Sequence, residues 1–122
     1  MKLTTLIVVS STCALLTACS SGSVQDAKII VQKAMRAPSS FSMINGEEMW
    51  AGKHNGGYAY IVRIEYDGQN GFGATLRDCK IVAFTNTAGD LRWDPSSGLA
   101  TCENPSLDAA TAKAMRKYHF GA

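Results

Sequence analysis

The chain has 122 residues, the size of one small domain. It carries 12 Lys and Arg residues against 10 Asp and Glu residues, which gives a formal net charge of +2. Because a nucleic-acid surface needs a clustered excess of positive charge, this near balance argues against a nucleic-acid partner.

The first residues have the pattern of an export signal. Met1 and Lys2 supply a positive start, and residues 3–16 form an apolar run without a charged residue. A helix that crosses about 30 Å of hydrocarbon needs about 20 residues, so this run is too short to span a membrane. A basic start, a short apolar stretch and small residues before a cut are typical of a secretory signal.

The apolar run ends in Leu16-Thr17-Ala18-Cys19, which resembles the signal motif of bacterial lipoproteins. The resemblance implies that Cys19 receives a diacylglycerol, that the signal is cut before it, and that the new amino terminus is acylated, for example with palmitate. Two or three acyl chains make a stable anchor, whereas a single chain holds only marginally. Ser20 implies transfer to the outer membrane, facing the periplasm. The alternative is an ordinary secreted signal with a coincidental cysteine.

Three segments follow from this interpretation: a removed signal peptide over residues 1–18, the lipidated cysteine and a tether over residues 19–23, and a single domain over residues 24–122. Two further cysteines remain, Cys79 and Cys102, and in an exported chain they are expected to form a disulfide. The chain-entropy model gives about 3.4 kcal/mol for the loop of about 24 residues that they close. A metal site would need closer Cys and His spacing, so we expect none.

The domain is expected to begin with an amphipathic helix. Ser23 is the predicted N-cap, with Asp26 in the capping-box position, and Pro38 should end the helix at Ala37. The apolar positions repeat with helical spacing: Ala27, Ile30, Val31, Ala34 and Met35.

The middle of the chain has the alternation of strands. Residues 58–66 give the strongest signal, with Tyr58, Tyr60 and Tyr66 on one face. Further strands are predicted over residues 41–44, 48–51, 74–86 and 91–93, with a loop over residues 52–57 and a reversal over residues 67–73.

A second helix is expected to close the chain, with Ser106 as its N-cap and Asp108 in its first turn. Its predicted apolar stripe consists of Leu107, Ala110, Thr111, Ala114, Met115 and Tyr118. The order of elements predicts an α+β fold: a small antiparallel sheet of about four or five strands, an N-terminal and a C-terminal helix on one face of it, and one disulfide.

Two segments, residues 31–41 and residues 62–73, resemble a loose family of small exported bacterial proteins, many of them lipoproteins. The first is similar to a helix that stops at Pro-Ser-Ser, although Ala37 stands where the family has Asp. The second is similar to a strand that leads into an Asn-x-Phe-Gly turn. The resemblance implies a fold and no activity. In purely physical terms the same segments are a helix stop and a tight reversal, with Phe72 packed into the core.

The sequence offers little that points to catalysis, and we expect no cofactor and no catalytic residue. The glycine-rich residues 68–73 lack the following helix and the Lys-Ser or Lys-Thr pair of a phosphate-binding loop, and they also lack the acidic ligands of a calcium loop. His54 and His119 have no Ser or Cys partner in a recognisable nucleophile pattern. These features favour a non-enzymatic protein.

We therefore expect an accessory or binding module, anchored in the cell envelope, with an envelope protein or a glycan as partner. His54, Tyr58, Tyr60 and Tyr66 are the candidate partner-binding residues, since strand aromatics that no helix covers make a recognition surface. The same tyrosines could instead be core residues.

Two other functions stay open at this stage. The first is an inhibitor of an envelope hydrolase or a phage-type exclusion lipoprotein, which would present residues 53–57. The second is an envelope hydrolase that uses His54 or Glu65.

Overall fold

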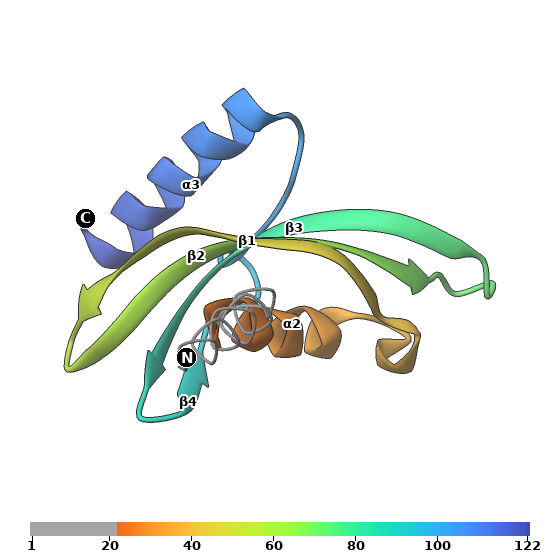
Figure 1. The fold of residues 1–122 in the computed structure, drawn as a ribbon, viewed down its shortest axis with the longest axis horizontal. Coiled ribbons are helices and arrows are strands. Elements are labelled where there is room, and N and C mark those ends of the chain that lie inside the picture. Colours follow the sequence, from red (N-terminus) through yellow and green to blue (C-terminus); the bar gives the residue numbers. More distant parts are fainter. Residues whose placement is uncertain (1–21) are drawn as a thin grey trace, which may run out of the picture.

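The computed structural model describes residues 22–122, so the signal, Cys19 and most of the tether lie outside the described residues. The elements follow one another as α2 (Gly22–Ala34), the 3-10 turn η2 (Pro38–Ser40), β1 (Ser42–His54), β2 (Gly57–Gln69), β3 (Thr75–Thr87), β4 (Asp90–Arg92), β5 (Leu99–Thr101) and α3 (Pro105–Phe120). They make an antiparallel sheet with an N-terminal and a C-terminal helix, which confirms the predicted α+β class (Figure 1).

Three long strands in the order β1-β2-β3 form the body of the sheet, and β4 and β5 both pair with β3. The alternation predicted for residues 58–66 is confirmed within β2. The two short strands predicted before the first turn are wrong, because β1 is continuous. Its register shifts between Met43 and Asn45 and again between Glu48 and Trp50. Such bulges break the alternation of side chains and make one strand look like two.

The two helices lie on opposite faces of the sheet, so the prediction that they share a face is wrong (Figure 1). Both faces of the central strands are apolar: Val62 and Ile64 pack toward α2, whereas Ile61 and Ile81 pack toward α3. All four of these side chains are completely buried. A sheet with two apolar faces needs a cover on each, and the helices supply them.

Helix α2 packs with the predicted face, and Ala27, Ile30 and Val31 are buried. Ser23 does not cap the helix, which begins at Gly22. Its hydroxyl instead donates to Glu48 Oε1 on β1 at 2.6 Å. The regular helix ends at Ala34, three residues before the predicted end, and η2 then turns the chain into β1.

Helix α3 is rotated relative to the prediction. Its N-cap is Asn104, not Ser106: the Asn104 side chain accepts from the Leu107 backbone N–H at 2.9 Å. The buried positions are Asp108, Ala112 and Met115, whereas Leu107 is 47% and Tyr118 77% exposed. The buried carboxylate explains the rotation.

Two links fasten α3 to the sheet. Asp108 accepts from Arg63 Nε on β2 at 3.4 Å and from the Glu103 backbone N–H at 2.6 Å. The predicted disulfide between Cys79 and Cys102 is confirmed, with a Cα–Cα distance of 5.4 Å. It ties β3 to the segment that leads into α3, so both links hold the start of the helix against the sheet.

Candidate functional site

The structure separates the four residues predicted to bind a partner. Tyr58, Tyr60 and Tyr66 alternate on the face of β2 that α2 covers, because Tyr60 and Tyr66 pack in the α2 core. His54 pairs with Gly57 and lies on the opposite face, where its ring contacts Phe120 of α3 at 5.3 Å. The four side chains therefore do not form one surface.

Tyr66 belongs to the core. It is 5% exposed, its ring stacks on Phe41 at 5.2 Å, and its hydroxyl donates to Asp78 Oδ2 at 3.0 Å. Burial, together with the neighbouring Asp78 carboxylate, raises the pKa of the Tyr66 hydroxyl above its ordinary value. A partner cannot reach this side chain without displacing the core.

The other two tyrosines differ in exposure. Tyr60 is half-buried against Phe84, with ring centroids 5.4 Å apart, and burial raises its pKa. Tyr58 is 49% exposed and lies 6.4 Å from the Tyr60 ring. The core interpretation therefore holds for Tyr66 and in part for Tyr60, and Tyr58 keeps an accessible ring.

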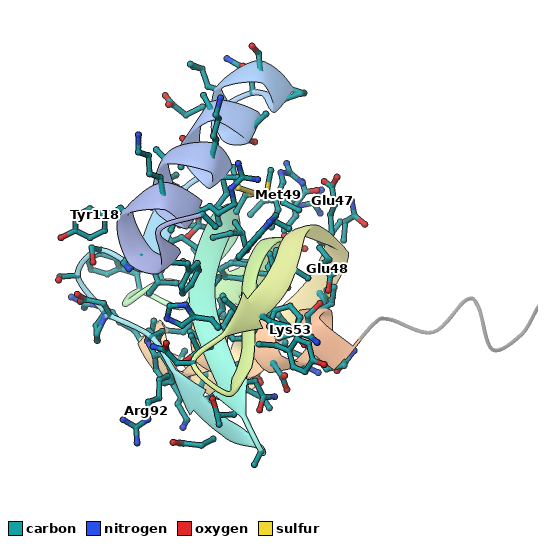
Figure 2. The ribbon with its side chains drawn as sticks, turned by 90° about the vertical axis from the view of Figure 1, so that its left-hand side faces the viewer. Glu47, Glu48, Met49, Lys53, Arg92 and Tyr118 are labelled. Atoms are coloured by element: carbon teal, nitrogen blue, oxygen red, sulfur yellow. A yellow bond between two sulfur atoms is a disulfide. The ribbon has the colours of Figure 1, made fainter. Side chains whose placement is uncertain are left out.

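The end of the β1–β2 hairpin has a hollow lined by residues 53–58. Figure 2 views the molecule from this side and labels Lys53. His54 is half-buried there, with Asn55 Nδ2 3.2 Å from its Nε2. The other histidine, His119, is also half-buried, and its Nε2 lies 3.0 Å from the Ser97 carbonyl oxygen. Both imidazoles take part in packing.

A second hollow lies between the end of α2 and the β2–β3 hairpin, and we call it the hairpin groove. Its volume is about 460 Å³. Its apolar lining comes from Val31, Ala34 and Met35 of α2 with Leu76 and Leu99 of the sheet. Its polar lining includes Arg36, Tyr66, Asp78 and Lys80.

The polar side of the hairpin groove is a connected set of groups. Asp78 Oδ2 accepts from the Tyr66 hydroxyl and lies 3.8 Å from Lys80 Nζ. Lys80 Nζ also donates to Thr101 Oγ1 at 3.1 Å. Arg36 at the rim has no ion-pair partner among residues 22–122. The groove thus combines an apolar wall with one uncompensated positive charge.

Beside the groove the chain reverses through residues 70–74, which we call the Phe72 turn. The expectation that Phe72 packs into the core is wrong, because its side chain is 97% exposed. Asn70 Oδ1 accepts from the backbone N–H groups of Phe72 and Ala74, at 2.9 and 3.0 Å. The Asn70 N–H donates to the Ala74 carbonyl at 3.0 Å, and Gly73 takes the left-handed conformation that closes the turn.

The arm that carries the Phe72 turn is also held in place. Arg77 on β3 donates to Asp67 on β2 through two nitrogens, at 2.9 and 3.3 Å, and the guanidinium lowers the pKa of that carboxyl. Leu76 on β3 is 53% exposed and lines the hairpin groove. The Phe72 turn adjoins the groove, because Asn70 and Gly71 of the turn also line it.

Residues 22–122 hold no group of three or more His, Cys, Asp or Glu side chains placed to bind a metal ion. No helix in this part of the chain has the length and apolar character needed to cross a membrane. The sequence predicted the chain reversal at residues 67–73. It did not predict that Phe72 is exposed, because exposure depends on which elements pack nearby.

Comparisons of the chain with protein-family models, with curated proteins and with solved structures find no match. The Phe72 turn and the hairpin groove together place an exposed aromatic side chain on a turn that adjoins an apolar hollow.

Proposed function

We propose that the protein is a lipid-anchored, non-enzymatic binding module of the bacterial cell envelope that holds a partner protein at the Phe72 turn and the hairpin groove. The observation that carries the proposal is the 97% exposure of Phe72 on a turn fixed by side-chain and backbone hydrogen bonds. The proposed anchor is supported by the motif Leu16-Thr17-Ala18-Cys19, and Ser20 supports the outer membrane, facing the periplasm, as its location.

An exposed phenylalanine on a fixed turn supports binding on energetic grounds. Burying such a side chain contributes about 1.5–3 kcal/mol. Because Asn70 already holds the turn, little conformational entropy is lost when a partner orders it. Aromatic side chains in well-packed contacts dominate the affinity of many interfaces.

The hairpin groove extends this contact. Leu76, Met35 and Leu99 offer an apolar wall for a side chain of the partner. Arg36 at the rim favours a carboxylate beside that apolar group, because its charge has no ion-pair partner among residues 22–122. A protein segment with an apolar and an acidic side chain fits both features.

The test is site-specific photocrosslinking in intact cells, followed by mass spectrometry. A photoreactive phenylalanine analogue replaces Phe72, and the matched control replaces Leu107, which is 47% exposed on the opposite side of the sheet. We expect one envelope protein to be captured from position 72 and not from position 107, and the capture to be lost in Cys19→Ser. Equal capture from both positions would contradict the proposal.

A direct affinity measurement completes the test. With the captured protein in hand, Phe72→Ala should weaken its binding about 10- to 100-fold, the equivalent of the lost burial. Tyr58→Ala, on the other hairpin end, should leave the affinity within about twofold. A larger loss of affinity from Tyr58→Ala than from Phe72→Ala would place the binding site at the β1–β2 end instead.

A second candidate, an inhibitor or exclusion factor, is favoured by the shape of the same arm. The β2–β3 hairpin extends past the end of α2 and carries the Phe72 turn at its tip (Figure 1). A fixed protruding turn suits insertion into a concave active site. The Lys53–Gly57 segment suits this role less, because only Asn55 and Gly56 lie outside the paired strands. Inhibition of an envelope hydrolase that Phe72→Ala abolishes would favour this candidate.

A further inference from the structure

The outer edge of β1 has no neighbouring strand within residues 22–122. We propose that a second copy of the chain pairs antiparallel with this edge, so that two sheets continue as one. An unpaired edge presents a row of free backbone N–H and C=O groups and serves as a template for another strand. The inference goes beyond partner binding, and it concerns a different part of the sheet.

The pairing pattern identifies which residues of β1 direct their backbone groups outward. On β3, the Ala83 N–H donates to Gly98 and the Cys79 carbonyl accepts from Cys102, so odd-numbered residues face away from β2. The even-numbered residues of β3 therefore bond to β2, for example Asp78 opposite Tyr66. Because bonding direction alternates along an antiparallel strand, the odd-numbered residues of β2 bond to β1.

The residues of β1 that pair with even-numbered residues of β2 make no backbone hydrogen bonds to β2, so their N–H and C=O groups point to the open edge. These residues are Met43, Gly46, Glu48, Ala51 and Lys53. The last four are spaced by two, three and two residues, because the bulge after Glu48 adds one position. This spacing is the same in both directions along the strand. An antiparallel second copy therefore matches these four outward residues with one another: Gly46 with Lys53, and Glu48 with Ala51.

Charge selects this register over its neighbour. It places Lys53 of the second copy diagonally next to Glu48, and opposite charges at such positions on neighbouring strands attract. The alternative register, with Met43 opposite Ala51, would place the two copies of Glu48 diagonally next to each other, where they repel. Glu48 and Lys53 are both exposed, and Figure 2 labels both along β1.

The symmetry of the pair suits anchored molecules. The two-fold axis of two antiparallel strands in one sheet is perpendicular to the sheet, so both copies of α2 lie on the same face. Both chains then enter their domains at Gly22 on that face, which lets the two proposed lipid anchors share one membrane. The Phe72 turn lies on the β2–β3 hairpin and takes no part in the edge.

Cysteine pairing in native membranes tests the register. The full-length double variant Glu48→Cys/Ala51→Cys places thiols opposite each other, at the Cα separation of about 5.5 Å that suits a disulfide. We expect mild oxidation to give a product of twice the monomer mass, and far less of it from Met43→Cys/Ala51→Cys, which reports the other register. Absence of a self-crosslink, or crosslinks only to other proteins, would overturn the proposal.

Proline substitution separates dimerisation from folding. The Ala51 N–H faces outward, so Ala51→Pro leaves the β2 ladder intact, whereas the Gly52 N–H bonds to β2. In detergent, sedimentation of the full-length protein should show a dimer that Ala51→Pro weakens at least 10-fold, while the unfolding midpoint stays unchanged at concentrations where native protein and variant are both monomeric. Gly52→Pro should lower that midpoint. A native protein that sediments only as a monomer, or a dimer unaffected by Ala51→Pro, would refute the pairing.

Discussion

The two ends of the long hairpins carry the same dipeptide in very different surroundings. At the β1–β2 end, Asn55 and Gly56 form a two-residue turn with positive φ angles of 45° and 82°. At the β2–β3 end, Asn70 and Gly71 begin a longer turn that displays Phe72. The first end is packed against α3, whereas the second extends past the end of α2 (Figure 1).

The difference comes from what lies over each end. The last turn of α3 brings Phe120 against His54 and Trp50, at 5.3 and 5.7 Å, and so closes the first end. Helix α2 ends at Ala34, which leaves the hairpin groove open beside the second end. Whether an aromatic residue is accessible is therefore decided by a distant segment of the chain.

The largest effect is expected when the disulfide is removed. Cys79→Ser/Cys102→Ser should lower the free energy of unfolding by about 3 kcal/mol, since the unfolded chain regains the freedom of the closed loop. The start of α3 loosens as well, because Cys102 ties the segment before it to β3. Urea unfolding gives the energy, and amide hydrogen exchange gives the location. Increased exchange in the Phe72 turn as large as that in α3 would contradict this account.

Removing the cover of the first end has the next largest effect. Phe120→Ala should cost about 2–3 kcal/mol of stability, because Trp50 and His54 lose their ring contact. The matched change at the second end, Phe72→Ala, should cost less than about 0.5 kcal/mol, since Phe72 is 97% exposed. Thermal unfolding compares the two variants. Equal losses would mean that the two ends are packed alike.

Much of the fold could be predicted from local patterns. The alternation along residues 58–66, the helical spacing of Ala27, Ile30 and Val31, and the cysteine pair each correspond to a feature of the structure. These features depend on residues close in sequence, or on the count of a rare residue. For these features the tertiary packing agrees with the secondary structure that the local sequence favours.

The candidate site could not be predicted, because it depends on rotation and position. Of the stripe predicted for α3, Met115 is buried, whereas Leu107 and Tyr118 are exposed, because the helix turns Asp108 and Ala112 toward the sheet instead. A carboxylate facing the core contradicts simple hydrophobic patterning. Exposure of Phe72 likewise follows from where α2 ends, which its own neighbours in sequence do not encode.

A smaller loss of stability is expected when the Tyr66 hydroxyl, which lines the hairpin groove, is removed. Burial and Asp78 raise the pKa of Tyr66, so the native state holds this proton more tightly than the unfolded chain does. The contribution to stability is complete below about pH 10 and declines as the pH rises above that value. Tyr66→Phe should cost about 1 kcal/mol at pH 7 and flatten the alkaline decline. Chemical unfolding at pH 7 to 11 tests this, with Tyr58→Phe as control. Identical alkaline slopes for native protein and Tyr66→Phe would show that this proton contributes nothing.

The smallest change in stability is expected from Asn70→Ala, which should make the Phe72 turn more mobile while the protein stays folded. Asn70→Ala removes the oxygen that accepts from the Phe72 and Ala74 N–H groups, while the backbone bond from Asn70 to Ala74 persists. Because these bonds are exposed to water, we expect a loss below about 1 kcal/mol. The same two amides should exchange about 5- to 10-fold faster, since an opening costs about 1 kcal/mol less. Gln69→Ala, outside the turn, is the control. If exchange at Phe72 stayed at its native rate, the side chain of Asn70 would not be what fixes the turn, and the ordered display of Phe72 would have to come from the backbone alone.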